Sequence, residues 1–75
     1  MYHIEWWSET RGEDVQLRDF ATLAEAARQA ESVSAGYGAQ IGQRVAVFVY
    51  NDNNTYMGRA VNGTYRADGA EYAEP

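Results

Sequence analysis

The sequence predicts an α+β fold with two layers, in which one helix packs on an antiparallel sheet of four or five strands. Three observations support this prediction. Stretches near the N-terminus alternate apolar and polar residues, as half-buried strands do. An alanine-rich stretch follows, with apolar residues at spacings of three and four. The segment 44–61 then holds two apolar runs joined by a polar turn, which is typical of a hairpin.

The first expected strand covers residues 1–10. Its alternation places Tyr2, Ile4 and Trp6 on one face, and the other face then carries His3, Glu5, Trp7 and Glu9. On that outer face we expect a solvated histidine and a tryptophan that points into solvent. After a turn at 11–14, residues 15–20 are expected to form a second strand, with a helical extension as the alternative.

The expected helix begins at Leu23 and runs to about Ser34. Thr22 and Glu25 form a capping box, in which the threonine side chain accepts a backbone hydrogen bond and the glutamate reaches back. The stretch 34–42 contains three glycines and is expected to end the helix and form a flexible connection. Because the apolar side of the helix is mostly alanine, we expect it to lie close to the sheet, which must supply the bulk of the core.

The strongest strand signal is 43–50, where alternate residues are valines and the residues between them include Phe48 and Tyr50. Both faces are apolar, so the pattern leaves open which one is buried. Asp52 and two asparagines supply the turn to a returning strand at 55–61. The Asn62-Gly63 pair predicts a further hairpin, which would make 64–67 a fifth strand. Residues 68–75 are expected to form an acidic, frayed tail of the single domain 1–75.

Composition excludes several kinds of function. The chain has 75 residues, no cysteine and one histidine, so a thiolate nucleophile and an ordinary zinc site are both excluded. It contains no nucleotide-binding or nucleophile motif, and a core this small leaves little room for a catalytic cleft. We therefore expect a non-enzymatic protein without a cofactor or a metal ion.

Charge and segment lengths limit the partners and the location. The formal net charge is −5, which argues against nucleic acid or an anionic membrane as a direct partner, since both require a positive surface. A protein partner with a basic surface fits better. No secretory signal or membrane-spanning run is visible, so a cytoplasmic location is expected. The protein itself is expected to be a monomer or a homodimer.

The candidate binding residues are aromatic side chains and the carboxylates around them. Exposed tryptophan and tyrosine are the usual anchors of protein interfaces, and the carboxylates would meet arginine or lysine. The set comprises Glu5, Trp7, Glu9, Glu13, Asp14, Tyr50 and Asp52. Two alternatives remain open: Trp7 packs against its own sheet or a loop, or it forms a stacking platform for a small molecule.

In its size, its acidity and its lack of catalytic residues, the chain resembles small inhibitors encoded by phages and mobile elements, such as anti-CRISPR proteins. That resemblance implies a protein that occludes the nucleic-acid-binding surface of a bacterial complex. The segment 20–27, FATLAEAA, resembles the strand-to-helix entry of small bacterial α+β proteins, including antitoxins of the HicB kind. This second resemblance implies an antitoxin-like or accessory module that dimerises through its sheet and binds one protein partner.

Overall fold

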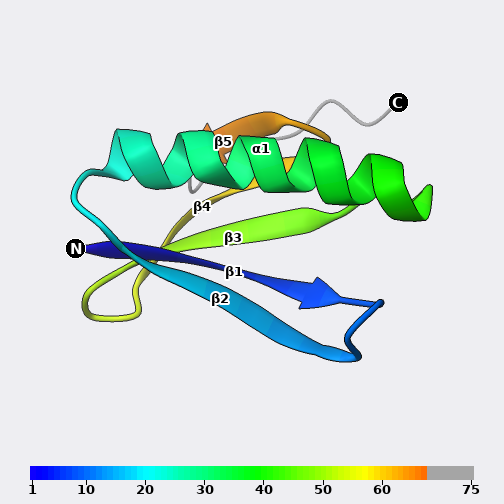
Figure 1. The fold of residues 1–75 in the computed structure, drawn as a ribbon. Helices are drawn as coiled ribbons and strands as arrows, with labels where there is room; N and C mark the ends of the chain where they lie inside the picture. The colour runs from blue at the N-terminus through cyan, green and yellow to red at the C-terminus, as the bar shows by residue number, and fades with distance from the viewer. Residues whose placement is uncertain (68–75) are drawn as a thin grey trace.

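The chain forms one helix and five strands in the computed structural model, which describes residues 1–67. The expectation for residues 68–75 falls outside this range. The elements are β1 (Tyr2–Ser8), β2 (Glu13–Phe20), α1 (Leu23–Ile41), β3 (Ala46–Asn51), β4 (Tyr56–Val61) and β5 (Thr64–Ala67). The strands form an antiparallel sheet in the order β2-β1-β3-β4-β5, and α1 lies across one face of it (Figure 1). The predicted two-layer fold is confirmed, including the fifth strand.

The helix is longer than predicted and this corrects the expectation for residues 34–42. Instead of a flexible connection, the stretch continues α1 through Gly36 and Gly38 to Ile41. The helix ends at Gly42, which adopts a left-handed conformation with φ of 68°. The amide of Gln43 closes the end by donating to the carbonyl of Gly38 at 3.1 Å. Helical glycine costs about 1 kcal/mol relative to alanine, so tertiary packing must offset that cost.

A stripe of small residues explains how α1 approaches the sheet. The four buried residues of the helix recur at every fourth position and are Ala26, Ala30, Ser34 and Gly38. At Gly38 a β-carbon would come within 3.0 Å of the carbonyl oxygen of Gln43, so the glycine permits close packing there. The prediction of a helix with a small buried face is therefore confirmed, and that face extends one turn beyond the expected end.

The core uses the valine side of β3. Val45, Val47 and Val49 are buried together with Ile4 and Ala60 beneath the helix. Phe48 and Tyr50 consequently lie on the opposite, uncovered face of the sheet, because successive side chains of a strand alternate. This answers the question that the sequence left open for residues 43–50.

The turn between β4 and β5 is fastened to the helix. Asn62 and Gly63 both have positive φ, as the predicted hairpin requires. The hydroxyl of Ser34 accepts a hydrogen bond from the amide of Gly63 at 2.9 Å, and Glu31 accepts one from the amide of Tyr65 at 3.1 Å. These contacts hold the last described strand under α1.

The other side of the sheet is covered less completely. Residues 15–20 form a strand as predicted, and β2 extends from Glu13. A bulge where Asp19 adopts a φ of 71° bends the strand before Phe20. The β1–β2 hairpin projects away from α1 (Figure 1), so most of β2 is exposed. No helix within residues 1–67 is long and apolar enough to cross a bilayer.

Candidate binding surface on the open sheet face

The sheet face opposite α1, called here the open face, presents side chains from all five strands. Strand register and alternation identify its members. They are Asp14, Gln16 and Arg18 of β2, His3, Glu5 and Trp7 of β1, Ala46, Phe48 and Tyr50 of β3, Tyr56, Arg59 and Val61 of β4, and Thr64 and Arg66 of β5.

Trp7 is the large apolar side chain that stands out on this face, since 58% of it is exposed. It lies directly across the hairpin from Asp14, and Glu5 precedes it on the same face. Glu9 follows in the turn, and Glu13 begins β2 opposite Ser8, with its side chain toward the other face. The prediction that Trp7 points outward is therefore confirmed. We call Glu5, Trp7, Glu9, Glu13 and Asp14 the acidic corner.

A shallow hollow of about 250 Å³ lies beside Trp7. It forms because β1 pairs with β3 only from Tyr2 to Glu5, so the two strands separate beyond that point. Trp7 and Glu9 line one side of the hollow. The other side is lined by residues 43–46, Phe48 and the helix end at Ile41. The exposed indole thus stands at the rim of a recess, a shape that suits insertion of a partner side chain.

The middle of the open face carries an aromatic cluster made of His3, Phe48, Tyr50 and Tyr56. The imidazole of His3 stacks on Tyr50 with ring centroids 5.2 Å apart, and Tyr50 and Phe48 each contact Tyr56 at 6.1 Å. His3 is only 6% exposed, so the expectation of a solvated histidine is wrong. Alternation places His3 on the outer face correctly, but the tyrosine ring from the neighbouring strand covers it.

Burial in this cluster changes the acidity of Tyr50. Removal of the phenol from water raises the pKa of Tyr50 above 10.0, and the negative charge of Glu5 adds to the effect. The neutral phenol is therefore the form that the folded cluster favours. Tyr50 lies at the opposite end of β1 from Trp7, because β1 and β3 are antiparallel and Tyr50 pairs with His3.

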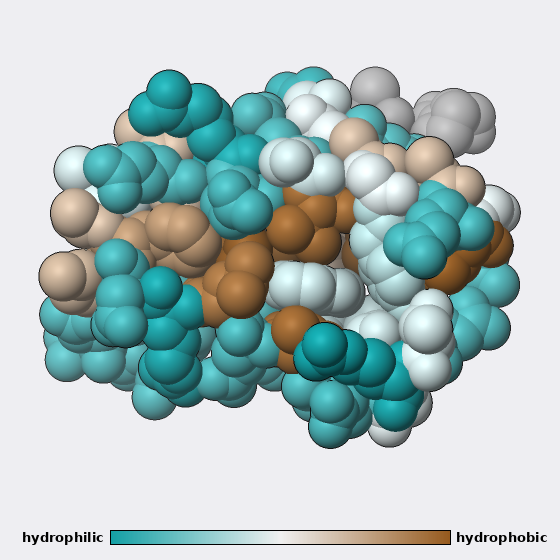
Figure 2. All heavy atoms as spheres, in the orientation of Figure 1, coloured by the Kyte–Doolittle hydropathy of each residue, from teal (hydrophilic) through white to brown (hydrophobic). Residues whose placement is uncertain are grey.

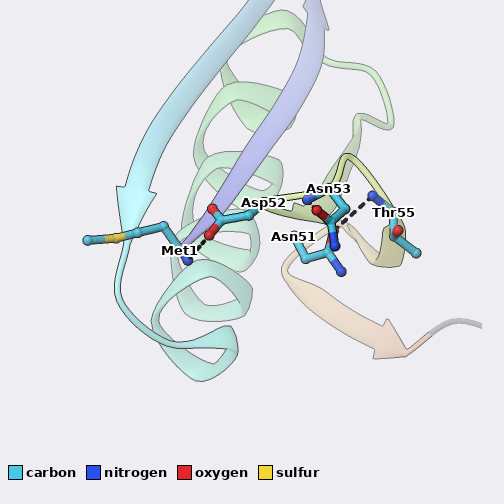
Figure 3. Close-up of polar contacts among 5 residues, drawn as sticks. All are labelled: Met1, Asn51, Asp52, Asn53 and Thr55. Carbon is cyan, nitrogen blue, oxygen red and sulfur yellow. Dashed lines mark hydrogen bonds and ion pairs between the residues drawn. The ribbon is translucent and has the colours of Figure 1, made fainter.

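Asp52 lies in the β3–β4 turn, away from the acidic corner. Its carboxylate accepts a 2.7 Å hydrogen bond from the amino group of Met1, as an exposed ion pair (Figure 3). The neighbouring Asn51 shapes the turn, since its side-chain oxygen accepts from the amides of Asn53 and Thr55 at 2.9 and 3.0 Å. Of the seven candidate residues, five form the acidic corner, while Tyr50 and Asp52 lie at the other end of the sheet.

Charge on the open face is divided rather than uniformly acidic. Glu5 and Asp14 are its acidic residues, and both lie on the β1–β2 side. Three arginines share the face, one on β2 and two toward the β4–β5 side: Arg18, Arg59 and Arg66. The negative charge is thus concentrated around Trp7, and an approaching basic surface would meet it at the hairpin.

The turn that bears Glu9 is held in place by Tyr37 of the helix. The amide of Thr10 donates to the Tyr37 hydroxyl at 3.0 Å, and that hydroxyl lies 3.3 Å from the hydroxyl of Ser8. Hydrogen bonds to Ser8 and Thr10 lower the pKa of Tyr37. Tyr37 lies in the stretch that was expected to be a connection, which is why its role is invisible in the helical pattern.

Within residues 1–67, no group of three histidine or carboxylate side chains is arranged to hold a metal ion. Comparison with known protein families, characterised proteins and solved structures finds no match to the chain.

Proposed function

We propose that the protein is a non-enzymatic binding protein that docks its acidic corner on a basic surface of another protein. The exposure of Trp7 beside the carboxylates of Glu5, Glu9 and Asp14 is the observation that carries this proposal. A tryptophan that folding leaves in solvent gains its burial energy only when a partner covers it, and tryptophans are frequent anchors of interfaces.

The neighbouring charges favour a basic partner. Carboxylates around an apolar anchor increase the rate of encounter with a positive surface and reject a negative one. Partners of this kind include complexes that handle nucleic acid, and the resemblance to anti-CRISPR-type inhibitors points in the same direction. Covering such a surface would exclude its nucleic acid without any catalytic step.

Simple occlusion explains the geometry better than imitation of DNA. Side chains two residues apart on a strand face are about 7 Å apart, close to the phosphate spacing along one DNA strand. Trp7 separates Glu5 from Glu9, so these carboxylates do not reproduce that spacing. The arginines on the rest of the face would also oppose the basic partner if the whole face were used.

Affinity capture from a bacterial lysate tests this function. The wild-type chain is expected to retain a nucleic-acid-handling complex, with or without nuclease, and Trp7→Ala is expected to lose it. Asp52→Ala is the matched control, since it removes an exposed carboxylate at the far end of the sheet. Retention by Trp7→Ala would contradict the proposal. Capture of one small protein alone would favour the antitoxin-like alternative.

A further inference from the structure

The strand β2 is an edge of the sheet that the rest of the described chain leaves open. Within residues 1–67 it pairs with β1 on one side only. An edge strand presents unpaired backbone donors and acceptors, which makes it a template for another strand. Seven residues, from Glu13 to Asp19, precede the end of the strand, and most of them are exposed.

The side of β2 that faces the helix layer is apolar and incompletely covered. Leu17 is 38% exposed, and it lies with Val15 and Trp6 along a groove of about 470 Å³. Tyr37 and Gln40 of α1 form the opposite wall of this groove. Figure 2 shows exposed apolar residues in a band between the helix and the hairpin. The band lies directly beside the open edge, so one occupant would cover both.

We propose that this occupant is a second copy of the chain, paired antiparallel through β2 with Gln16 facing Gln16 across a two-fold axis. In that register Asp14 of each copy lies opposite Arg18 of the other, and this occurs twice by symmetry. These side chains share the open face. Oppositely charged cross-strand pairs stabilise a sheet.

The same register matches the apolar side. Val15 of each copy lies opposite Leu17 of the other, so the two grooves meet and cover these side chains. The bulge at Asp19 ends regular pairing after Arg18, which is where the symmetric segment Asp14–Arg18 also ends. A bulge and charged side chains usually prevent an edge strand from pairing with other chains. In this register they are compatible with pairing to β2 of a second copy.

Neighbouring registers fit less well. Moving the axis to Val15 places Asp14 opposite Gln16 and Glu13 opposite Leu17. Moving it to Leu17 places Asp14 opposite Phe20, beyond the bulge. Only the axis at Gln16 joins opposite charges on one face and apolar side chains on the other.

This dimer would have a defined shape. Because the axis is perpendicular to the sheet, the two five-stranded sheets continue into one, with both helices on the same side and both open faces on the other. Each copy would keep its own Trp7 exposed. The dimer would use Asp14 of the acidic corner, and it would leave Glu5, Trp7 and Glu9 available to the partner proposed there.

Analytical ultracentrifugation over a concentration series of the full chain tests the proposal. Wild type is expected to dimerise reversibly. Arg18→Glu, which sets like charges opposite each other twice, is expected to raise the dissociation constant by at least about tenfold. The double variant Asp14→Arg with Arg18→Glu exchanges the charges and is expected to restore dimerisation. Arg28→Glu, an equal charge change on an exposed helix position, is the control and should leave it unchanged.

A monomer at every concentration would overturn the proposal and assign the groove to a different protein. A dimer that Arg18→Glu leaves intact would also overturn it, because the interface would then lie elsewhere. Circular dichroism of each variant confirms that it is folded, and the restored double variant excludes misfolding as the cause.

Cross-linking tests the register, since the chain has no cysteine. Gln16→Cys is expected to form a disulfide-linked dimer under mild oxidation, because directly opposed residues have Cα atoms about 4.5–5.5 Å apart, within disulfide range. Asp14→Cys and Arg18→Cys should not cross-link alone, since their symmetry mates lie about 13 Å away. A mixture of these two variants should cross-link. Efficient linking of either variant alone would contradict this register.

Discussion

At the scale of single residues, the two adjacent tryptophans of β1 point to opposite faces of the sheet and have different roles. Trp6 packs against the core beneath the helix, whereas Trp7 is 58% exposed beside a hollow. One step along an extended strand reverses the face of a side chain. The same side chain therefore stabilises the core at position 6 and remains available for binding at position 7.

This division predicts opposite consequences for the two alanine substitutions. Trp7→Ala is expected to change the free energy of unfolding by less than about 0.5 kcal/mol, as surface substitutions do. Trp6→Ala should cost about 2 kcal/mol or more, because it removes packed apolar volume. Urea denaturation of both variants measures the difference. An equal loss of stability in the two variants would place Trp7 in the core instead.

Tyr50 and Tyr37 predict a dependence of stability on alkaline pH with opposite signs. The pKa of Tyr50 is raised, so its neutral phenol favours the folded state, and this contribution is lost as pH rises above about 10. The pKa of Tyr37 is lowered, so its ionisation favours the folded state as pH approaches the same value. Tyr50→Phe should therefore make the alkaline loss of stability shallower, and Tyr37→Phe should make it steeper. Denaturation midpoints at several pH values measure both slopes, and equal slopes would contradict the assignment.

At the scale of elements, a glycine of the helix and a glycine of the sheet differ in the space around them. Gly36 lies on α1 with nothing within 4 Å of a β-carbon placed there. Gly58 of β4 has a φ of 156°, and a β-carbon there would overlap the backbone carbonyl oxygen of Arg66 and come within 2.5 Å of the Tyr65 hydroxyl. That hydroxyl donates to the carbonyl of Met57 at 3.1 Å, so the ring is held over the glycine.

Alanine at these two positions is expected to have opposite effects. Gly58→Ala should destabilise the fold by about 2–3 kcal/mol, because the new methyl group overlaps the Arg66 carbonyl oxygen and the Tyr65 ring and the backbone is strained. Gly36→Ala should stabilise it by about 0.5–1 kcal/mol through helix propensity. Thermal and urea unfolding measure both. A neutral Gly58→Ala variant would contradict this, because both the β5 backbone at Arg66 and the Tyr65 ring would have to shift without cost.

At the scale of the whole molecule, the fold is a flat body of 31 × 28 × 16 Å with one helix on a five-stranded sheet. A single helix cannot cover both faces of a sheet, nor the full width of one face. The uncovered areas are the open face and the β2 edge, and the two proposed interactions lie there. The net charge of the chain is −5, and three of its eleven carboxylates belong to residues 68–75.

Charge also predicts how binding responds to salt. If the acidic corner meets a basic partner, raising the salt from about 0.05 M to 0.5 M should weaken the captured complex by at least about tenfold through screening. Glu9→Gln should reduce that dependence, while Asp52→Asn, at the distant turn, should not. Equilibrium binding at several salt concentrations measures the slope. A complex indifferent to salt would argue against charge complementarity.

Local patterns were sufficient for most of the fold. Alternation defined the strands, Thr22 and Glu25 marked the start of the helix, and Asn62-Gly63 predicted the last hairpin. The hairpin that these patterns predicted also brings most residues of the acidic corner together, because a hairpin pairs stretches that are neighbours in sequence. These features depend on contacts close in sequence, which is why the residues alone determined them.

Tertiary structure decided the rest, because long-range packing sets it. Gly38 stays helical because the helix approaches the sheet closely there, and the exposed Gly36 lies within the same helix. The valine face of β3 turns inward since Ile4 and the small helix stripe complement it, and His3 is buried by a ring from another strand. Whether an outward aromatic side chain stays exposed depends on its neighbours across the sheet. Tyr50 stacks on His3 of the neighbouring strand. Trp7 has no such neighbour on β3, because β1 and β3 separate beside it.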